Sequence, residues 1–107
     1  MEIEKNGACF LNSRRIELLG LIREHGSILS ASKALRMSYQ QAWSIIRDIN
    51  SSSPLPVVVR QRGGANGGGA VVTEYGQNLI SRYESLLYRF NRCIAEMDDE
   101  LQSICSF

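Results

Sequence analysis

Apolar residues recur every three or four positions through much of the first fifty residues, a spacing that gathers them on one face of a helix. A first helix is predicted over residues 13–25. Asn12 or Ser13 can cap its start, and His25-Gly26 closes it because glycine readily adopts the left-handed C-terminal conformation. A short second helix is expected over residues 31–36.

A third helix is predicted from residue 39 to about residue 50, after a turn at Met37 and with Ser38 as its N-cap. Four apolar residues of this helix fall on one face and are expected in the core: Ala42, Ile45, Ile46 and Ile49. The opposite face is polar.

The segment that follows favours a β-hairpin. Pro54 and Pro56 cannot continue the third helix. Residues 57–59 and 70–72 are rich in valine, which favours strands. Between them lies the glycine-rich run Gly63-Gly64-Ala65-Asn66-Gly67-Gly68-Gly69. The sequence therefore predicts two strands joined by a glycine-rich tip.

The clearest pattern is a final helix from residue 74 to about residue 103, which Thr73 can cap. Its apolar residues alternate at spacings of three and four, close to a heptad repeat. They are Leu79, Tyr83, Leu86, Phe90, Ile94, Met97, Leu101 and Ile104. The spacing predicts a continuous apolar stripe along this helix.

The length of the final helix bears on its partner. About thirty residues extend ~45 Å at 1.5 Å per residue, whereas a compact domain of this size has a radius of gyration of ~13 Å. A helix folded back on its own domain is one alternative. A symmetric homodimer through this helix is favoured, because it covers the apolar stripe with a second copy.

Composition indicates one modest domain of 107 residues, 44% of them hydrophobic. The acidic N-terminus does not look like a secretory signal and no stretch can span a bilayer, so a cytoplasmic protein without membrane contact is expected. Three widely spaced cysteines and one histidine suggest neither a disulfide framework, a metal site nor a catalytic triad. We therefore expect no enzyme and no cofactor.

Charge is unevenly distributed behind a net value of +1. Between Arg14 and Arg92 basic residues outnumber acidic ones by eleven to five, whereas the last fifteen residues carry four acids and no base. A basic body with an acidic tail fits a protein that meets a polyanion through one region, although an ordinary solvated surface of mixed charge fits as well.

Residues 30–50 have the layout of a helix-turn-helix, whose second helix would enter the major groove of DNA. The polar face of that helix carries Gln40, Gln41, Ser44 and Arg47, side chains that can bond base edges. Tyr39, near the helix start, can donate to a phosphate. Alone, these residues also fit an ordinary polar helix face, and Trp43 fits either the core or an aromatic edge beside DNA.

The hairpin favours the DNA-binding interpretation. Arg60 and Arg62 alternate with Gln61 and so point to one face of the strand. They flank a tip whose glycines permit close approach to a surface, so the hairpin could follow a phosphate backbone or enter a minor groove. The glycine run lacks the Gly-Lys-Ser/Thr ending of a nucleotide-binding loop and precedes a strand rather than a helix, which disfavours nucleotide binding.

Three segments together resemble a known family. They are Gly26-Ser27-Ile28, Ser38-Tyr39-Gln40-Gln41-Ala42-Trp43, and the run from Gly63 to Gln77 that contains Thr73-Glu74-Tyr75-Gly76. They resemble the N-terminal domain of ModE, the molybdate-dependent transcriptional regulators, over roughly residues 14–95. A looser likeness to LysR-type regulators covers the same region. Two departures concern the helix-turn-helix: Arg36 occupies a turn that often carries glycine, and Leu29 replaces a polar residue, so Ser27 or Ser30 must cap the second helix.

The resemblance implies a winged helix-turn-helix, mainly α with a small β-hairpin, that binds a palindromic operator in double-stranded DNA as a homodimer. Residues 1–73 would form the DNA-binding domain, and residues 74–107 the dimerisation helix and acidic tail. The implied DNA contacts are Ser38, Tyr39, Gln40, Gln41, Ser44, Arg47, Arg60, Arg62, Asn66 and Gly67.

No molybdate-binding domain is expected within the chain, which leaves any effector sensing to a separate partner. The alternative function is a winged-helix adaptor that contacts proteins and does not bind DNA.

Overall fold

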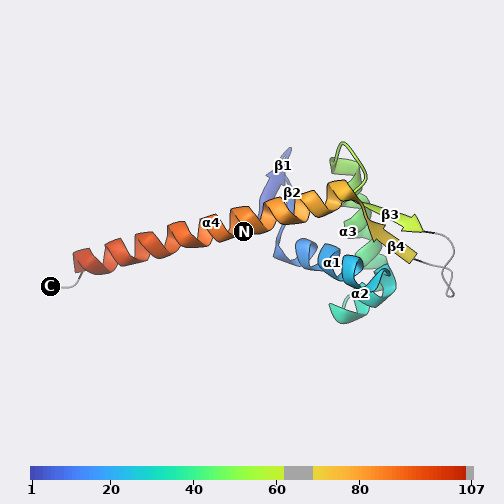
Figure 1. Cartoon of the computed structure of the whole chain (residues 1–107), viewed down its shortest axis with the longest axis horizontal. Coiled ribbons are helices and arrows are strands. Elements are labelled where there is room, and N and C mark those ends of the chain that lie inside the picture. Colours follow the sequence, from blue (N-terminus) through green and yellow to red (C-terminus); the bar gives the residue numbers. More distant parts are fainter. Residues whose placement is uncertain (62–68, 106–107) are drawn as a thin grey trace.

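The computed structural model describes residues 1–61 and 69–105, and it is mainly helical (Figure 1). Two small antiparallel hairpins and three short helices form a head, and one long helix leaves it. The elements are β1 (Ile3–Lys5), β2 (Ala8–Leu11), α1 (Ser13–His25), α2 (Ile28–Ala34), α3 (Tyr39–Ser52), β3 (Val58–Gln61), β4 (Gly69–Val72) and α4 (Glu74–Cys105). The mainly helical class predicted from the sequence is confirmed.

α1 has the predicted bounds and caps. The Asn12 side chain accepts a hydrogen bond from the Arg15 backbone N–H at 2.8 Å. At the other end Gly26 has a φ of 67°, and its N–H donates to the carbonyl oxygen of Ile22. The buried face of α1 consists of Ile16, Leu18, Leu19 and Ile22.

α2 begins three residues before the predicted start, because Ser27 rather than Ser30 caps it: the Ser27 side chain accepts from the Ser30 N–H at 3.2 Å. Leu29 faces solvent, so its departure from a polar residue leaves the cap intact. The turn after α2 places Arg36 in the left-handed region, with a φ of 55°. Met37 then returns to the core.

α3 is closed at its start by a complete capping box. The Ser38 hydroxyl accepts from the Gln41 N–H at 3.0 Å, while the Gln41 side chain accepts from the Ser38 N–H at 3.1 Å. Three of the four predicted core residues, Ala42, Ile46 and Ile49, are buried, and Ile45 packs partly buried against the core.

The second hairpin is tied to α3 by Asn50. Its side-chain oxygen accepts from the N–H groups of Val57 and Val58 at 2.8 and 3.2 Å, and its amide donates to the Val58 carbonyl at 3.0 Å. The strands pair from Val58 with Val72 to Gln61 with Gly69. Gly69, the last residue of the predicted glycine-rich tip, begins β4, whereas residues 62–68, and with them Arg62, Asn66 and Gly67, lie outside the described residues.

The first hairpin, formed by β1 and β2, was not predicted from the sequence. β1 and β2 are joined at Asn6-Gly7, both with positive φ. Leu11 enters the core from this hairpin. The Lys5 ammonium donates to the Ser52 carbonyl, which joins the hairpin to the end of α3.

α4 first packs on the head and then leaves it. Gly76, Ile80 and Tyr83 are buried, whereas every described residue from Tyr88 onward is exposed. The C-terminal end of α4 lies far from the head, on the side opposite the β3–β4 hairpin (Figure 1). The 32-residue helix is ~48 Å long. It gives the molecule extents of 65 × 28 × 22 Å and a radius of gyration of 17.3 Å. The alternative of a helix folded back on its own domain is wrong for the described residues.

The buried position of Tyr83 corrects its predicted role in dimerisation. The side chain is only 2% exposed, and its hydroxyl donates to the Met1 carbonyl at 2.6 Å. Tyr83 therefore belongs to the core of its own chain and is not free to meet a partner.

Among the described residues, no helix has both the length and the apolar character needed to cross a membrane.

Candidate nucleic-acid interface

Three exposed side chains on the polar face of α3 make no bonds to other described residues of the chain. Gln40, Ser44 and Arg47 are spaced three and four residues apart, which places them on one side of the helix. Within residues 1–61 and 69–105, none of these three side chains takes part in a hydrogen bond or ion pair. Their donors and acceptors are therefore open to an external ligand.

Two neighbouring candidates are less free. Ser38 and Gln41 are exposed, yet their side chains are engaged with each other's backbone in the capping box. Any contact by Gln41 to a base edge would have to replace this pairing. The structure therefore favours Gln40, Ser44 and Arg47 over Gln41 as groups that could bond bases.

One flank of the α3 face meets the second hairpin. The guanidinium carbon of Arg60, on β3, lies 4.1 Å from the centre of the Trp43 ring. Tyr39 meets the same indole edge-to-face at a centroid distance of 6.3 Å. Trp43 is half-buried against the core, so it is both a packing residue and part of the surface. The structure thus brings Tyr39 and Arg60, both predicted site residues, to one place.

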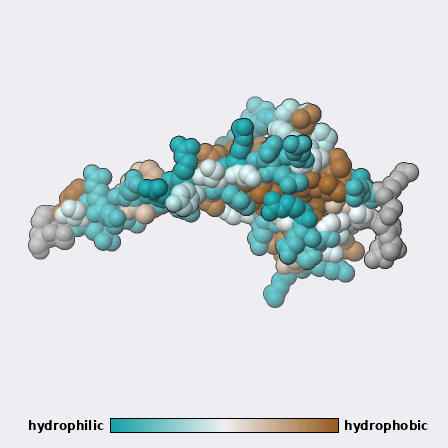
Figure 2. All heavy atoms as spheres, viewed as in Figure 1, coloured by the Kyte–Doolittle hydropathy of each residue, from teal (hydrophilic) through white to brown (hydrophobic). Residues whose placement is uncertain are grey.

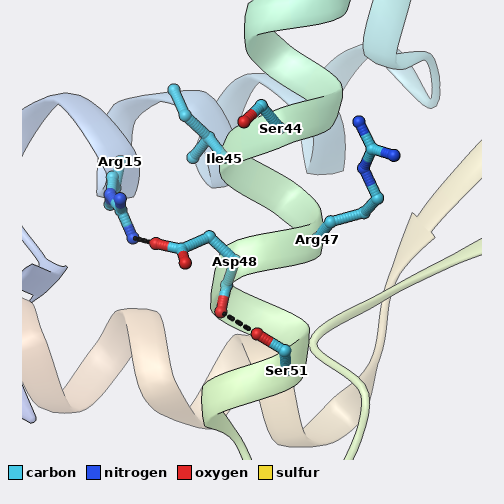
Figure 3. Close-up of a pocket in the computed structure, with 6 residues that line it drawn as sticks. All are labelled: Arg15, Ser44, Ile45, Arg47, Asp48 and Ser51. Carbon is cyan, nitrogen blue, oxygen red and sulfur yellow. Dashed lines mark hydrogen bonds and ion pairs between the residues drawn. The ribbon is translucent and has the colours of Figure 1, made fainter. Parts of the chain in front are cut away.

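The other flank meets α1, as Figure 3 shows. The Arg15 guanidinium pairs with the Asp48 carboxylate at 2.7 Å and donates to the Phe10 carbonyl at 3.2 Å. Arg47 projects from the opposite side of α3 (Figure 3). Arg15, Ser44, Arg47 and Asp48 border a shallow hollow of about 400 Å³. Because Arg15 neutralises Asp48, the positive charge of Arg47 is not opposed on this face.

A second hollow of about 250 Å³ is bordered by Arg14, Gln41 and Ser44. Neither Arg14 nor Asp48 was among the residues predicted to contact DNA. No pattern in the sequence indicates that the start of α1 lies beside α3, since that proximity arises from tertiary packing. Arg14 is exposed and has no ion-pair partner among the described residues, so it adds a second cationic flank to the α3 face.

The residues predicted for dimerisation lie in two settings. Leu79 packs partly buried against the core, and Tyr83 is fully within it. The remaining members are between 43% and 57% exposed, and Ile104 is 59% exposed. From here on, the apolar stripe means the exposed part of the predicted stripe, which consists of Leu86, Phe90, Ile94, Met97, Leu101 and Ile104. Apolar side chains are visible among polar ones along this projecting part of α4 (Figure 2).

Comparisons with known proteins define the class. No protein-family model matches the chain. The molybdenum transport protein ModE of Azotobacter vinelandii is 33% identical over 104 residues, which cover 97% of this chain and 38% of that protein. The transcriptional regulator ModE of Haemophilus influenzae is 37% identical over 86 residues, covering 80% of this chain and 34% of its own length. The DNA-binding transcriptional dual regulator ModE of Escherichia coli is 46% identical over 77 residues, 72% of this chain and 29% of that regulator.

The class with which the chain aligns is thus that of transcriptional regulators. More particularly, the chain contains a ModE-like domain, and the resemblance inferred from its Ser-Tyr-x-x-Ala-Trp and Thr-x-x-Gly motifs is confirmed. The chain spans about a third of the length of these relatives, between 29% and 38%. The looser likeness to LysR-type regulators stays a prediction.

Proposed function

We propose that this chain is a sequence-specific DNA-binding regulator, in which α2 and α3 act as a helix-turn-helix and the β3–β4 hairpin acts as its wing. The observation that carries the proposal is the unpaired polar face of α3 between two cationic flanks, Arg60 on the hairpin and Arg14 on α1. A major groove offers base edges between two rows of phosphates, so this arrangement of charge and polarity is complementary to it.

Individual roles follow from the chemistry of the side chains. Arg47 can bond guanine in a bidentate manner, Gln40 can bond adenine, and Ser44 can bond either bases or phosphates. Arg60 and Arg14 suit phosphates, since a charged side chain at the margin of the face meets the backbone before it meets a base. Arg62, Asn66 and Gly67 remain proposed wing contacts.

The active form is proposed to be a homodimer through α4. The apolar stripe continues the buried face of α4 beyond the head, so it needs cover that its own described chain does not provide. A two-fold pair would present two α3 helices to the two half-sites of a palindromic operator, spaced by one or more helical turns of ~34 Å each. A separate effector-sensing partner stays a proposal of the same kind.

Two substitutions test the DNA-binding proposal. Arg47→Ala should weaken binding and change base preference at one position, because a base contact is lost. Arg60→Ala should weaken binding about equally on all sequences and lower the slope of log affinity against log salt by about 1, because a phosphate contact is lost. Selection of binding sites from a random DNA library, followed by fluorescence anisotropy at several salt concentrations, measures both effects.

Arg89→Ala on α4 is the matched control, since it removes an exposed cation away from the α3 face and should leave the base preference unchanged. Equal losses on every DNA sequence for both Arg47→Ala and Arg60→Ala would contradict the assigned roles. Wild-type protein without salt-dependent DNA affinity would instead favour the adaptor alternative.

A further inference from the structure

Tyr39, Trp43 and Arg60 form a small cluster, here called the aromatic–arginine cluster, where the hairpin meets α3. The Arg60 guanidinium lies over the face of the Trp43 indole, and the Tyr39 ring meets that indole at an interplanar angle of 89°. In this cluster two side chains of α3 lie together with one side chain of β3, that of Arg60. It therefore connects the helix proposed to read bases with the strand proposed to follow phosphates.

The geometry leaves Arg60 half satisfied. Its guanidinium carbon lies over the indole, 4.1 Å from the ring centre, a distance suited to a cation–π contact. Among the described residues its N–H groups have no hydrogen-bond acceptor and no ion-pair partner. A guanidinium held by its face presents its edge outward, and that planar fork matches the oxygens of a phosphate.

The indole itself is held in an unusual way. The Trp43 Nε1 is buried and has no acceptor within the described part of the chain. An unpaired buried donor destabilises the fold, so packing alone would be served better by phenylalanine at this position. Tryptophan, however, offers the strongest cation–π surface of the aromatic residues. The structure thus combines an unfavourable N–H with the most favourable face for Arg60.

We propose that Trp43 is a positioning residue of the DNA interface. It holds the Arg60 guanidinium flat against α3 so that the free N–H edge meets a backbone phosphate beside the groove that α3 occupies. This inference rests on the proposed DNA binding. It adds that one aromatic side chain, that of Trp43, fixes the position of the hairpin's phosphate contact relative to the base contacts of α3.

Trp43 is the only tryptophan of the chain, so its fluorescence reports the cluster directly. Without DNA, Arg60→Ala should change the emission of Trp43, whereas Arg89→Ala should not. This arm tests the stacking in the free protein and does not depend on any DNA affinity. Identical emission from wild type and Arg60→Ala would overturn the cluster.

With DNA, Trp43→Leu should reproduce the effect of Arg60→Ala: a roughly tenfold loss at moderate salt and a salt slope lowered by about 1. The double variant should lose no more than either single variant, because both remove the same contact. Trp43→Phe keeps an aromatic face and should retain most of the affinity and the wild-type slope. Additive losses, or an unchanged slope in Trp43→Leu, would show a merely structural tryptophan.

Arg60→Lys decides the matter if Trp43→Leu fails to fold, as urea unfolding would reveal. Lysine keeps the charge but loses the flat stack and the fork, so it should lose most of what alanine loses. Wild-type affinity in Arg60→Lys would overturn the positioning role. If wild-type protein binds no DNA, the proposed function fails by itself, and that outcome is distinct from additive losses in a protein that does bind.

Discussion

At the scale of single residues, Gly76 and Thr73 determine how α4 meets the head. A Cβ built on Gly76 would lie 2.4 Å from the Val57 carbonyl oxygen and 2.8 Å from a Val72 methyl group. The Thr73 hydroxyl accepts from the Gly76 N–H at 3.0 Å and donates to the Pro56 carbonyl at 2.6 Å. The Thr-x-x-Gly motif therefore has a physical reason: one residue caps the helix, and the other lets its backbone pass close to residue 57.

Gly76→Ala should destabilise the protein by about 1–3 kcal/mol, because the added methyl group overpacks against backbone that cannot easily move. Helix propensity works in the opposite direction by about 1 kcal/mol and does not compensate a contact this short. Gly20→Ala is the matched control: Gly20 also lies in a helix, but a Cβ there meets nothing within 4 Å. It should stabilise by roughly 0.5–1 kcal/mol. Urea unfolding of both variants checks the prediction, and a gain of stability in both would contradict it.

Cys9 is a second case in which one residue's surroundings set its chemistry. Burial raises the pKa of the Cys9 thiol, and a hydrogen bond with Glu2 raises it further. Since only the thiolate reacts, a raised pKa means less reactive sulfur at a given pH. At pH 8, iodoacetamide should label Cys9 more slowly than the exposed Cys93 and Cys105, and its rate should keep rising at higher pH. Peptide mapping by mass spectrometry measures all three rates in one sample, and equal rates would contradict the prediction.

At the scale of elements, the sequence predicted which segments form helices, but it did not predict every helix start correctly. α1 and the start of α3 were predicted correctly because asparagine, serine and glycine occupied positions with one dominant role. The predicted start of α2 was wrong because Ser27 and Ser30 are equally good caps in isolation. Only the burial of Ile28 distinguishes them. The first hairpin was missed although Asn6-Gly7 is a strong turn signal, since its short flanking strands hardly alternate.

The joint between α3 and the second hairpin could not be foreseen from pattern. Asn50 looks like an ordinary polar residue near a helix end, yet it makes three hydrogen bonds to the backbone of residues 57 and 58. The sequence likewise indicated Gln40, Ser44, Arg47 and Arg60 as one site but could not bring Arg14 and Asp48 to it. The contacts of Arg14 and Asp48 follow from the packing of segments far apart in the sequence, and those of Asn50 depend on how the chain turns after α3, so neither has a signature in the pattern.

Asn50→Ala should destabilise the protein by about 1–3 kcal/mol, because two N–H groups and one carbonyl lose their partner. DNA affinity should fall as well, since the base of the hairpin is then no longer fixed to α3. Asn50→Asp is the informative comparison: the carboxylate still accepts from both N–H groups but cannot donate to Val58, so it should recover part of the stability. Urea unfolding and anisotropy of the same samples separate the two effects, and wild-type stability in Asn50→Ala would contradict this account.

At the scale of the whole molecule, α4 uses one face for two purposes. The spacing that buries Gly76, Ile80 and Tyr83 continues through the exposed stripe without a break. Sequence periodicity therefore predicted a long apolar helix, but it could not show where the head ends and free surface begins. That boundary depends on the size of the head, which explains why Tyr83 was assigned to the wrong side of it.

The charges beside the stripe indicate how two copies would pair. Residues 82–92 of the helix carry three bases, Arg82, Arg89 and Arg92, against the single acid Glu84, whereas the later part carries Glu96, Asp98, Asp99 and Glu100 and no base. A parallel pair would bring like charges together, whereas an antiparallel pair brings the basic part of one copy beside the acidic part of the other. An antiparallel dimer centred near residue 95 is therefore expected.

The native cysteines test this orientation in a Cys9→Ser background. In an antiparallel pair, the two copies of Cys93 lie close to the two-fold axis, whereas the two copies of Cys105 are about 30 Å apart along the helix at 1.5 Å per residue. A short bismaleimide should therefore cross-link the variant that keeps only Cys93 and not the variant that keeps only Cys105. A parallel pair would cross-link both. Sedimentation analysis that shows only monomers would contradict the homodimer itself. The apolar stripe would then need another partner.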